Sequence, residues 1–318
     1  MSKVDEEVLK RAQGCLLGQL AGDSLGGLVE FKTPEQIRRD YPNGVRDLTE
    51  GGTWNTLAGQ PTDDSEMALA LARMLAESGE YDREKARKAY VEWLGSHPFD
   101  CGLTVAEGLE GRLNQYSQAN GALMRISPLG IFGTKYPPEQ VARWAMEDAE
   151  LTHPNRICKH ANALFAMAIS HAVRTGRGGM ELYDLTWEWT ENLDADEGLL
   201  DAVSGAADAP PPDYLNQAGW VLTAFRNAFW QMLNASGPEE AVIDTIMRGG
   251  DTDTNAAVCG ALLGAVHGRE AIPERWTKVL LNCRPDSNRP EVRRPRPEAY
   301  WPHDALDLAE KLLAPYGG

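Results

Sequence analysis

The 318-residue sequence has only five cysteines, and no two of them form a C-x-x-C pair. Widely spaced cysteines in apolar runs are typical of free thiols in a reducing compartment, which argues against a disulfide framework or a zinc site. Basic residues are also in deficit, with 31 Lys and Arg against 47 Asp and Glu and a formal net charge of -16. Nucleic acids and anionic membranes are therefore not expected as partners.

Two further absences narrow the fold. No apolar run approaches the roughly 20 residues that a membrane helix needs. Alternating, β-branched segments bounded by turns are almost missing, which argues against a sheet. The first residues, MSKVDEEVLKR, are acidic and have no apolar centre. We therefore expect no signal peptide and a cytoplasmic protein.

What the sequence does contain is helical periodicity in nearly every segment. It is clear in residues 6–22, 63–77, 158–173, 219–233 and 238–249. Because neither a fixed repeat nor a low-complexity linker occurs, we predict a single compact all-α domain over residues 1–318.

Two segments of this predicted bundle have unusual compositions. Gly14, Gly18 and Gly22 recur every four residues and would give one helix a smooth face for close packing. Residues 283–302 are rich in Pro and Arg, which predicts an extended strap before a last helix. The strap has five arginines between 284 and 296, and nearby acids favour a solvated face for them.

Acidic residues stand at the starts of two apolar helical segments. The stretch RGGDTDTNAAVCGALLGAVHG (residues 248–268) has Asp251 and Asp253, and PTDDSEMALALARML (residues 61–75) has Asp63 and Asp64. One interpretation is capping, with Glu66 completing a capping box three residues after Asp63. A cap needs only one side chain, however, so both starts carry more carboxylates than capping requires.

The second interpretation is a metal site. If the two helix starts face each other, four carboxylates and two hydroxyls converge, and their repulsion would have to be neutralised. An all-oxygen set without cysteine or histidine favours Mg²⁺ or Mn²⁺, with Ca²⁺ as an alternative, over Zn²⁺. Two ions that share bridging aspartates would match the number of ligands. Spacing alone leaves open whether the two starts meet.

In this context the chain resembles the ADP-ribosylglycohydrolase family. Six motifs occur in the family's order: GCLLGQLAGDSLGGLVEF (14–31), PTDDSEMALALA (61–72), NGALMRISPLG (120–130), THPN (152–155), GWVLTAFRNAFW (219–230) and RGGDTDTNAAVCGALLGAVHG (248–268). The resemblance implies an orthogonal helical bundle with a cleft for two divalent cations, Mg²⁺ or Mn²⁺, between helix ends.

The resemblance also assigns residues to that cleft. The implied metal ligands are Thr62, Asp63, Asp64, Asp251, Asp253 and Thr254. Glu30 matches a glutamate at the cleft rim, although its residue type alone would indicate only a solvated loop. Asp63, Asp64 or a water held by the ions are candidate bases, and Glu30 is the candidate for delivering or orienting a proton. Asp23 is implied either as a ligand or as support for a helix end.

The substrate side of the cleft is implied in the same way. The positions that match ADP-ribose contacts are Asn120, Gly121, Ala122, Met124, Arg125, His153 and Trp220. An Asn-Gly pair beside a helix start offers amides to ribose and diphosphate, but it is also typical of an ordinary turn. Arg125 is equally compatible with an internal carboxylate, and lone histidines such as His153 are more often structural. Trp220 stands where relatives often have tyrosine, which leaves the leaving group in doubt.

These features predict metal-dependent hydrolysis of the glycosidic bond between ADP-ribose and an acceptor. We expect arginine-linked ADP-ribose on a protein, because an acidic cleft favours a guanidinium leaving group. The alternatives are serine-linked, polymeric or small-molecule ADP-ribosyl compounds, a non-catalytic ADP-ribose-binding member, or a metal-dependent phosphohydrolase outside the family. The expected partner is an ADP-ribosylated protein or an ADP-ribosyl small molecule, and the expected state is a monomer.

Overall fold

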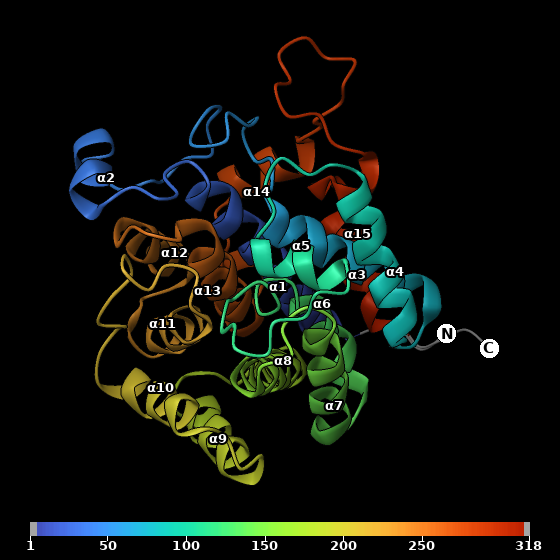
Figure 1. Cartoon of the computed structure of the whole chain (residues 1–318). Helices are drawn as coiled ribbons and strands as arrows, with labels where there is room; N and C mark the ends of the chain where they lie inside the picture. Colours follow the sequence, from blue (N-terminus) through green and yellow to red (C-terminus); the bar gives the residue numbers. More distant parts are fainter. Residues whose placement is uncertain (1–4, 315–318) are drawn as a thin grey trace.

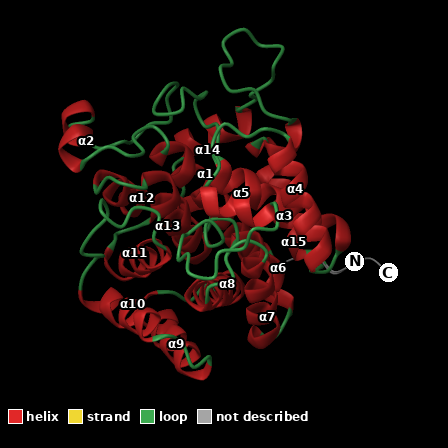
Figure 2. Cartoon of the chain, viewed as in Figure 1, coloured by secondary structure: helices red, strands yellow, loops and turns green. Residues whose placement is uncertain are grey.

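The computed structural model describes residues 5–314, and within them the chain is helical without a β-strand (Figures 1 and 2). This confirms the all-α prediction. The α-helices are α1 (Glu6–Gly26), α2 (Pro34–Asp40), α3 (Asp63–Ser78), α4 (Arg83–Gly95), α5 (Leu103–Leu109), α6 (Ser127–Phe132), α7 (Pro138–Glu150), α8 (Arg156–Thr175), α9 (Gly179–Asn192), α10 (Glu197–Asp208), α11 (Val221–Asn234), α12 (Pro238–Met247), α13 (Thr252–His267), α14 (Glu274–Asn282) and α15 (Ala305–Leu313). Short 3₁₀ turns lie at Gly133–Lys135, Arg269–Ala271, Glu298–Tyr300 and Pro302–Asp304.

Helices α1 and α13 form the centre of the bundle and pack face to face. The predicted glycine face of α1 makes this contact. A Cβ atom added at Gly18 or Gly22 would lie 2.1 Å from the carbonyl oxygen of Gly260 or Ala256. Only residues without a side chain allow two helix backbones to approach so closely. The approach also brings the end of α1 beside the start of α13, where a Cβ at Gly26 would lie 2.4 Å from the Cα of Asp253.

The other helices pack around this pair. Helices α8, α11 and α12 pack against α13, while α15 and α8 pack against α1. Helix α3 contacts α1, α13 and α15, so its first turn lies near the start of α13. The side chains between these helices form one apolar core, which includes Leu17, Leu20, Phe225 and Leu262. Helices α9 and α10 project at the edge of the bundle (Figure 1).

The strap at residues 283–302 is present, but one of its arginines is not solvated. Arg289, Arg293 and Arg294 are exposed as expected, whereas Arg296 is 5% exposed. Its guanidinium donates to Glu66 Oε2 at 2.7 Å. The expectation of a solvated face was therefore wrong for Arg296, because burial of Glu66 on α3 requires a cation as partner.

This ion pair also removes Glu66 from the predicted capping box. The Glu66 carboxylate accepts from Trp93 Nε1 at 2.8 Å and from Arg296. Thr62, at the N-cap of α3, makes no side-chain capping hydrogen bond. The capping interpretation therefore does not hold for Glu66, because its carboxylate is occupied by Trp93 and Arg296.

All five cysteines are free thiols, and four of them are buried, in agreement with the prediction. In the part of the chain that the structure describes, no helix has the length and apolar character to span a bilayer.

Candidate metal and substrate cleft

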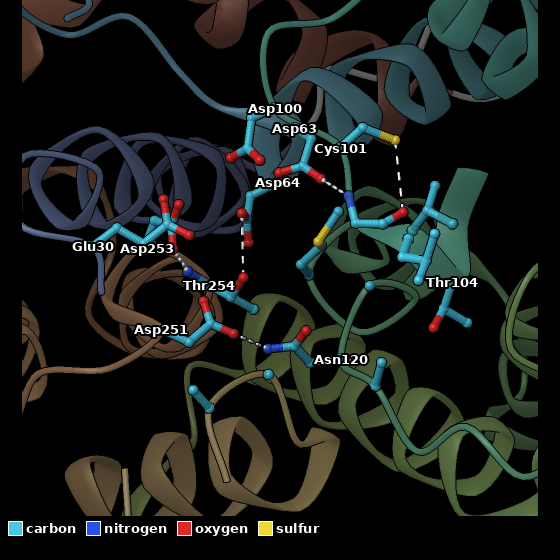
Figure 3. A pocket seen from close by; sticks show the side chains of 18 of the residues that line it. Glu30, Asp63, Asp64, Asp100, Cys101, Thr104, Asn120, Asp251, Asp253 and Thr254 are labelled. Carbon is cyan, nitrogen blue, oxygen red and sulfur yellow. Dashed lines mark hydrogen bonds between the residues drawn. The ribbon is translucent and has the colours of Figure 1, made fainter. Parts of the chain in front are cut away.

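The starts of α3 and α13 meet at a cleft of about 490 Å³. Asp63 and Asp64 come from the first turn of α3, while Asp251, Asp253 and Thr254 come from the start of α13, and all five line the cleft (Figure 3). Thr254 Oγ1 donates to Asp64 Oδ2 at 3.3 Å across the two helix starts. The structure therefore brings together the two acidic motifs, which are nearly 190 residues apart in the sequence.

Asp23, on α1, caps helix α3 from outside that helix. Its Oδ1 accepts from the backbone N–H of Thr62 at 3.0 Å and from the Thr62 hydroxyl at 2.9 Å. Its Oδ2 accepts from the N–H of Ser65 at 3.0 Å. Both oxygens are thus occupied by the helix start, so the structure favours the support role for Asp23. Asp63 and Asp64 are not needed as caps and face the cleft.

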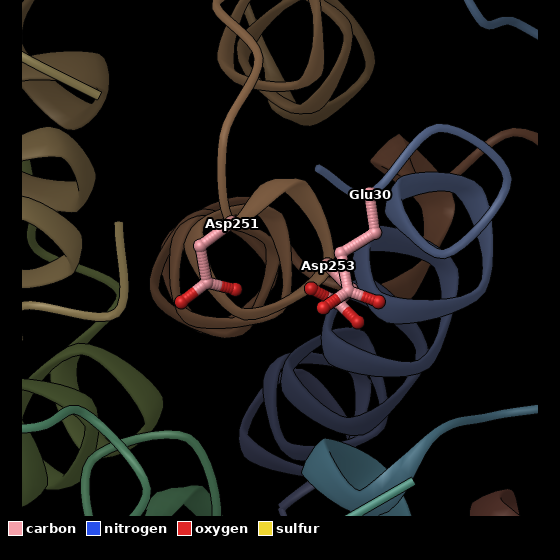
Figure 4. A group of neighbouring side chains, drawn as sticks. All are labelled: Glu30, Asp251 and Asp253. Carbon is pink, nitrogen blue, oxygen red and sulfur yellow. The ribbon is translucent and has the colours of Figure 1, made fainter. Parts of the chain in front are cut away.

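Glu30 approaches the α13 carboxylates from the turn that follows α1. Oxygens of Glu30, Asp251 and Asp253 lie within 4.8 Å of one another (Figure 4). Trp54 Nε1 donates to Glu30 Oε2 at 2.5 Å and fixes that carboxylate at the cleft rim. On the opposite side, Asn120 Nδ2 donates to Asp251 Oδ2 at 2.7 Å.

Burial and mutual repulsion weaken the acidity of this cluster. Burial, followed by nearby carboxylates, raises the pKa of Glu30 to about 8 and that of Asp100 to about 9. Burial likewise raises the pKa of Asp63 to about 7, and it raises the pKa values of Asp64 and Asp253 above the ordinary range. The folded chain alone therefore stabilises these groups poorly as anions.

The residues present fit a divalent cation. Asp64 Oδ1 is buried and has no hydrogen-bond partner among residues 5–314, which is costly for a carboxylate oxygen. The surrounding donors are carboxylate and hydroxyl oxygens, the ligands that Mg²⁺ and Mn²⁺ prefer. A cation here would satisfy that oxygen and offset the repulsion.

Asp100 is a cleft residue that the sequence did not reveal. It lies between α4 and α5, lines the cleft, and faces the Asp63 side of the cluster (Figure 3). No helix start or D-x-D spacing marks it in the segment PFDCG. Only the tertiary arrangement places it with the other acids.

The loop before α6 forms the other wall of the cleft. Of the residues predicted to contact ADP-ribose, Asn120, Gly121, Met124 and His153 line the cleft. The backbone N–H of Asn120 donates to Gly219 O at 2.9 Å, which ties this loop to the segment before α11. Ala122 is fully buried and does not line the cleft.

His153 presents a neutral imidazole to this wall. Its Nδ1 lies 2.7 Å from Thr152 Oγ1, and its Nε2 is buried without a partner in the part of the chain that the structure describes. Burial lowers the pKa of His153 to about 3. The free nitrogen is therefore available for a ligand hydrogen bond without a positive charge.

Arg125 points into the protein interior. Its Nε donates to Asp148 Oδ1 at 3.0 Å and its Nη1 to Thr152 Oγ1 at 3.0 Å, and the guanidinium stacks 4.3 Å above the ring of Tyr90. The side chain is fully buried and absent from the cleft lining. The internal-carboxylate alternative thus describes Arg125, because Asp148 is buried and needs a cation.

The Trp220 side chain also lies outside this cleft. Its Nε1 donates to Gln118 Oε1 at 2.8 Å, and its ring lines a separate small pocket with Pro211 and Pro212. Only the preceding residues, Ala218 and Gly219, reach the cleft. Trp220 therefore holds the wall in place and does not present its indole to the acidic cluster.

Comparisons with known proteins agree with this geometry. The sequence model of the ADP-ribosylglycohydrolase family matches residues 5–315. The ADP-ribosyl-[dinitrogen reductase] glycohydrolase of Rhodospirillum rubrum is 30% identical over 281 residues, 85% of this chain and 90% of that protein. An ADP-ribosylarginine hydrolase of Pseudomonas putida is 26% identical over 294 residues, 86% of this chain and 75% of that protein. A solved structure described as an ADP-ribosylglycohydrolase-related protein complex superposes with a TM-score of 0.78 at 25% identity, covering 97% of this chain and 99% of that chain.

Proposed function

This chain belongs to the ADP-ribosylglycohydrolase family and hydrolyses ADP-ribosyl glycosidic bonds, and we propose that its substrate is arginine-linked ADP-ribose on a protein. The observation that carries the proposal is the meeting of α3 and α13, whose aspartates face the cleft while Asp23 supplies the cap of α3.

In the proposal two divalent cations, Mg²⁺ or Mn²⁺, bind in the acidic cleft. The residues that would hold them are Thr62, Asp63, Asp64, Asp251, Asp253 and Thr254. When bound, the ions would supply Lewis-acid chemistry that orients the vicinal hydroxyls of the distal ribose and activates a water. The buried, unpartnered Asp64 Oδ1 and the raised pKa values of this cluster support this assignment.

The substrate would lie between the loop before α6 on one side and the carboxylates on the other. Asn120, Gly121 and the Nε2 of His153 lie on the wall that would receive the ADP-ribosyl group through hydrogen bonds. The scissile bond would then lie at the carboxylates. A positive charge develops on the ribose as the bond to the acceptor breaks, and the surrounding acids stabilise it.

Proton transfer would use two carboxylates with different environments. Asp63 or Asp64 would accept a proton from the attacking water, and Glu30 would donate one to the departing guanidino nitrogen. Burial raises the pKa of Glu30 to about 8 in the chain without bound cations, toward the value that suits a proton donor near neutral pH. Its hydrogen bond from Trp54 orients it at the cleft rim.

The acidic rim also favours arginine as the acceptor. Six acidic residues line the cleft, and this excess of acids favours a cationic acceptor over a neutral one: Glu30, Asp63, Asp64, Asp100, Asp251 and Asp253. A guanidinium leaves with modest acid assistance, whereas a serine oxygen requires more. Two relatives are named for arginine-linked or dinitrogen reductase-linked ADP-ribose, which supports the same choice. We further propose a cytoplasmic monomer with one domain.

The proposal is tested with matched arginine-linked and serine-linked ADP-ribosyl peptides. Release of free ADP-ribose is followed with Mg²⁺, with Mn²⁺ and with EDTA. We expect release from the arginine-linked peptide only, and only with a divalent cation. Release from the serine-linked peptide would contradict the linkage, and full activity in EDTA would contradict the metal site.

Asp253→Asn tests the cluster itself. Loss of a direct ligand should lower the rate at least about 100-fold, since even indirect support of a metal site contributes up to that factor. Asp208→Asn, at an exposed aspartate at the end of α10, is the matched control and should keep the wild-type rate. Equal rates for Asp253→Asn and the control would refute the assignment.

A further inference from the structure

Two large apolar side chains are exposed at the entrance of the cleft. Phe31 is 66% exposed and Leu103 is 74% exposed, and both line the cleft. The other large apolar side chains that are exposed among residues 5–314, such as Met180 on α9, do not line it. These two side chains are therefore the exposed apolar groups that a molecule entering the cleft can contact.

Phe31 is held in a strained conformation. Its φ is 65°, a left-handed value that bulky residues rarely adopt. Its N–H donates to Gly250 O at 2.8 Å, immediately before Asp251. The exposed ring gains little packing in return for this strain, and such strain clusters at functional sites.

Leu103 is anchored beside the start of α3. It is the first residue of α5, and the N–H of the preceding Gly102 donates to Asp63 Oδ2 at 3.1 Å. Phe31 is therefore hydrogen-bonded to the residue before Asp251, and Leu103 follows a residue that is hydrogen-bonded to Asp63. A molecule that contacts both side chains would be positioned relative to the carboxylates.

The volume of the cleft limits the size of the molecule that can enter it. A volume of about 490 Å³ suits a ligand of nucleotide size, so a protein acceptor must remain outside and reach in with one side chain. We infer that Phe31 and Leu103 form a docking rim for the polypeptide that carries the ADP-ribosyl group. This inference rests on the proposed function and adds the residues that recognise the acceptor chain.

The rim is tested by comparing two substrates that share the scissile bond. One is an arginine-ADP-ribosylated peptide, and the other is ADP-ribosyl-arginine without flanking residues. The variants are Phe31→Asn, which suits a left-handed backbone, and Leu103→Gln. Met180→Gln removes another exposed apolar side chain, on α9 and outside the cleft lining, and serves as the control.

Each rim variant should lower kcat/KM for the peptide about tenfold through KM, which corresponds to the partial burial of one apolar side chain. The same variants should change kcat/KM for ADP-ribosyl-arginine less than about twofold. Equal losses on both substrates, or an unchanged peptide KM, would overturn the docking rim. The control variant should match wild type on both substrates.

Failure of the proposed function gives a different result. If the wild-type protein cleaves neither substrate, the proposed function falls, and calorimetry decides on the rim. Weaker binding of the modified peptide by Phe31→Asn, with unchanged binding of ADP-ribose, would support the rim. Unchanged binding of both would overturn it.

Discussion

The buried carboxylates of this protein fall into two groups. Asp64 and Asp253 are almost fully buried, and neither forms an ion pair with a Lys or Arg side chain in the described chain. The buried acids Asp148 and Glu66, by contrast, each have an arginine partner. The difference separates acids that the fold neutralises by itself from acids that leave room for an external cation.

The first prediction concerns the pH dependence of stability without metal. The pKa values of Glu30, Asp63 and Asp100 are about 8, about 7 and about 9, above their ordinary values of 4.5, 3.8 and 3.8. The folded state then holds protons that the unfolded state has released. Proton binding favours the folded state fully at pH values below the pKa values of the unfolded state. The free energy of unfolding should therefore fall by more than about 2 kcal/mol as pH rises from about 4 to about 9.

Thermal denaturation across this pH range, in EDTA and in Mn²⁺, measures the effect. Because a cation neutralises the ionised acids, the stability that Mn²⁺ adds to the folded state should increase with pH. Glu30→Gln should reduce the loss in EDTA at high pH. A flat profile in EDTA, or a cation effect independent of pH, would show that the acids are ionised without a counter-charge.

The helix packing of α1 and α13 is the element on which the cleft rests. Gly22→Ala would place a Cβ atom 2.1 Å from Ala256 O, against backbone that cannot rotate away. We expect a loss of about 3 kcal/mol in the free energy of unfolding, measured by denaturant titration. Gly95→Ala, at the end of α4 with open space around the position, should cost nothing or stabilise by about 0.5 kcal/mol.

Equal free energies of unfolding for the two glycine variants would contradict close packing as the reason for the glycine spacing. Cation binding gives a second measurement on the same two variants. Separation of α1 from α13 would move Asp253 away from Glu30, so Gly22→Ala should also bind a cation more weakly than Gly95→Ala.

The strap is attached to α3 by the buried pair of Arg296 and Glu66, with side-chain exposures of 2% and 1%. Arg296→Met leaves the Glu66 carboxylate buried without a cation and should cost about 3–5 kcal/mol. Arg293→Met, on the exposed face of the same strap, should change stability by less than about 0.5 kcal/mol.

The double variant Glu66→Met with Arg296→Met completes this test. Removal of both charges should recover much of the lost stability, because no buried ion remains unpaired. If the losses in the free energy of unfolding from the two single substitutions simply add in the double variant, the two side chains stabilise the fold independently of each other.

At the scale of the whole molecule, the cleft is lined by segments from Glu30 to Thr254, so its ligand should stabilise the entire fold. ADP-ribose at 100 times its Kd should add about 2.7 kcal/mol to the free energy of unfolding when a divalent cation is present. Thermal-shift titrations with ADP-ribose and with adenosine monophosphate measure this. An equal shift with the monophosphate at the same concentration would contradict binding of the distal ribose at the acids.

The sequence by itself determined the helical class, because apolar spacing and the rarity of strand patterns are local properties. It also indicated the glycine face of α1 and the two acidic helix starts, since each is a short pattern with its own physical reason. The motif order pointed to the family. These features need no knowledge of which segments meet in space.

Only the tertiary structure decided how the polar side chains are paired. Asp23 caps α3 from another helix, Glu66 pairs with Arg296 across 230 residues, and Arg125 turns inward to Asp148. Asp100 joins the acidic cluster without a local signal. A buried charge is satisfied by whichever partner the packing brings near, and the free energy of that choice depends on contacts distant in the sequence.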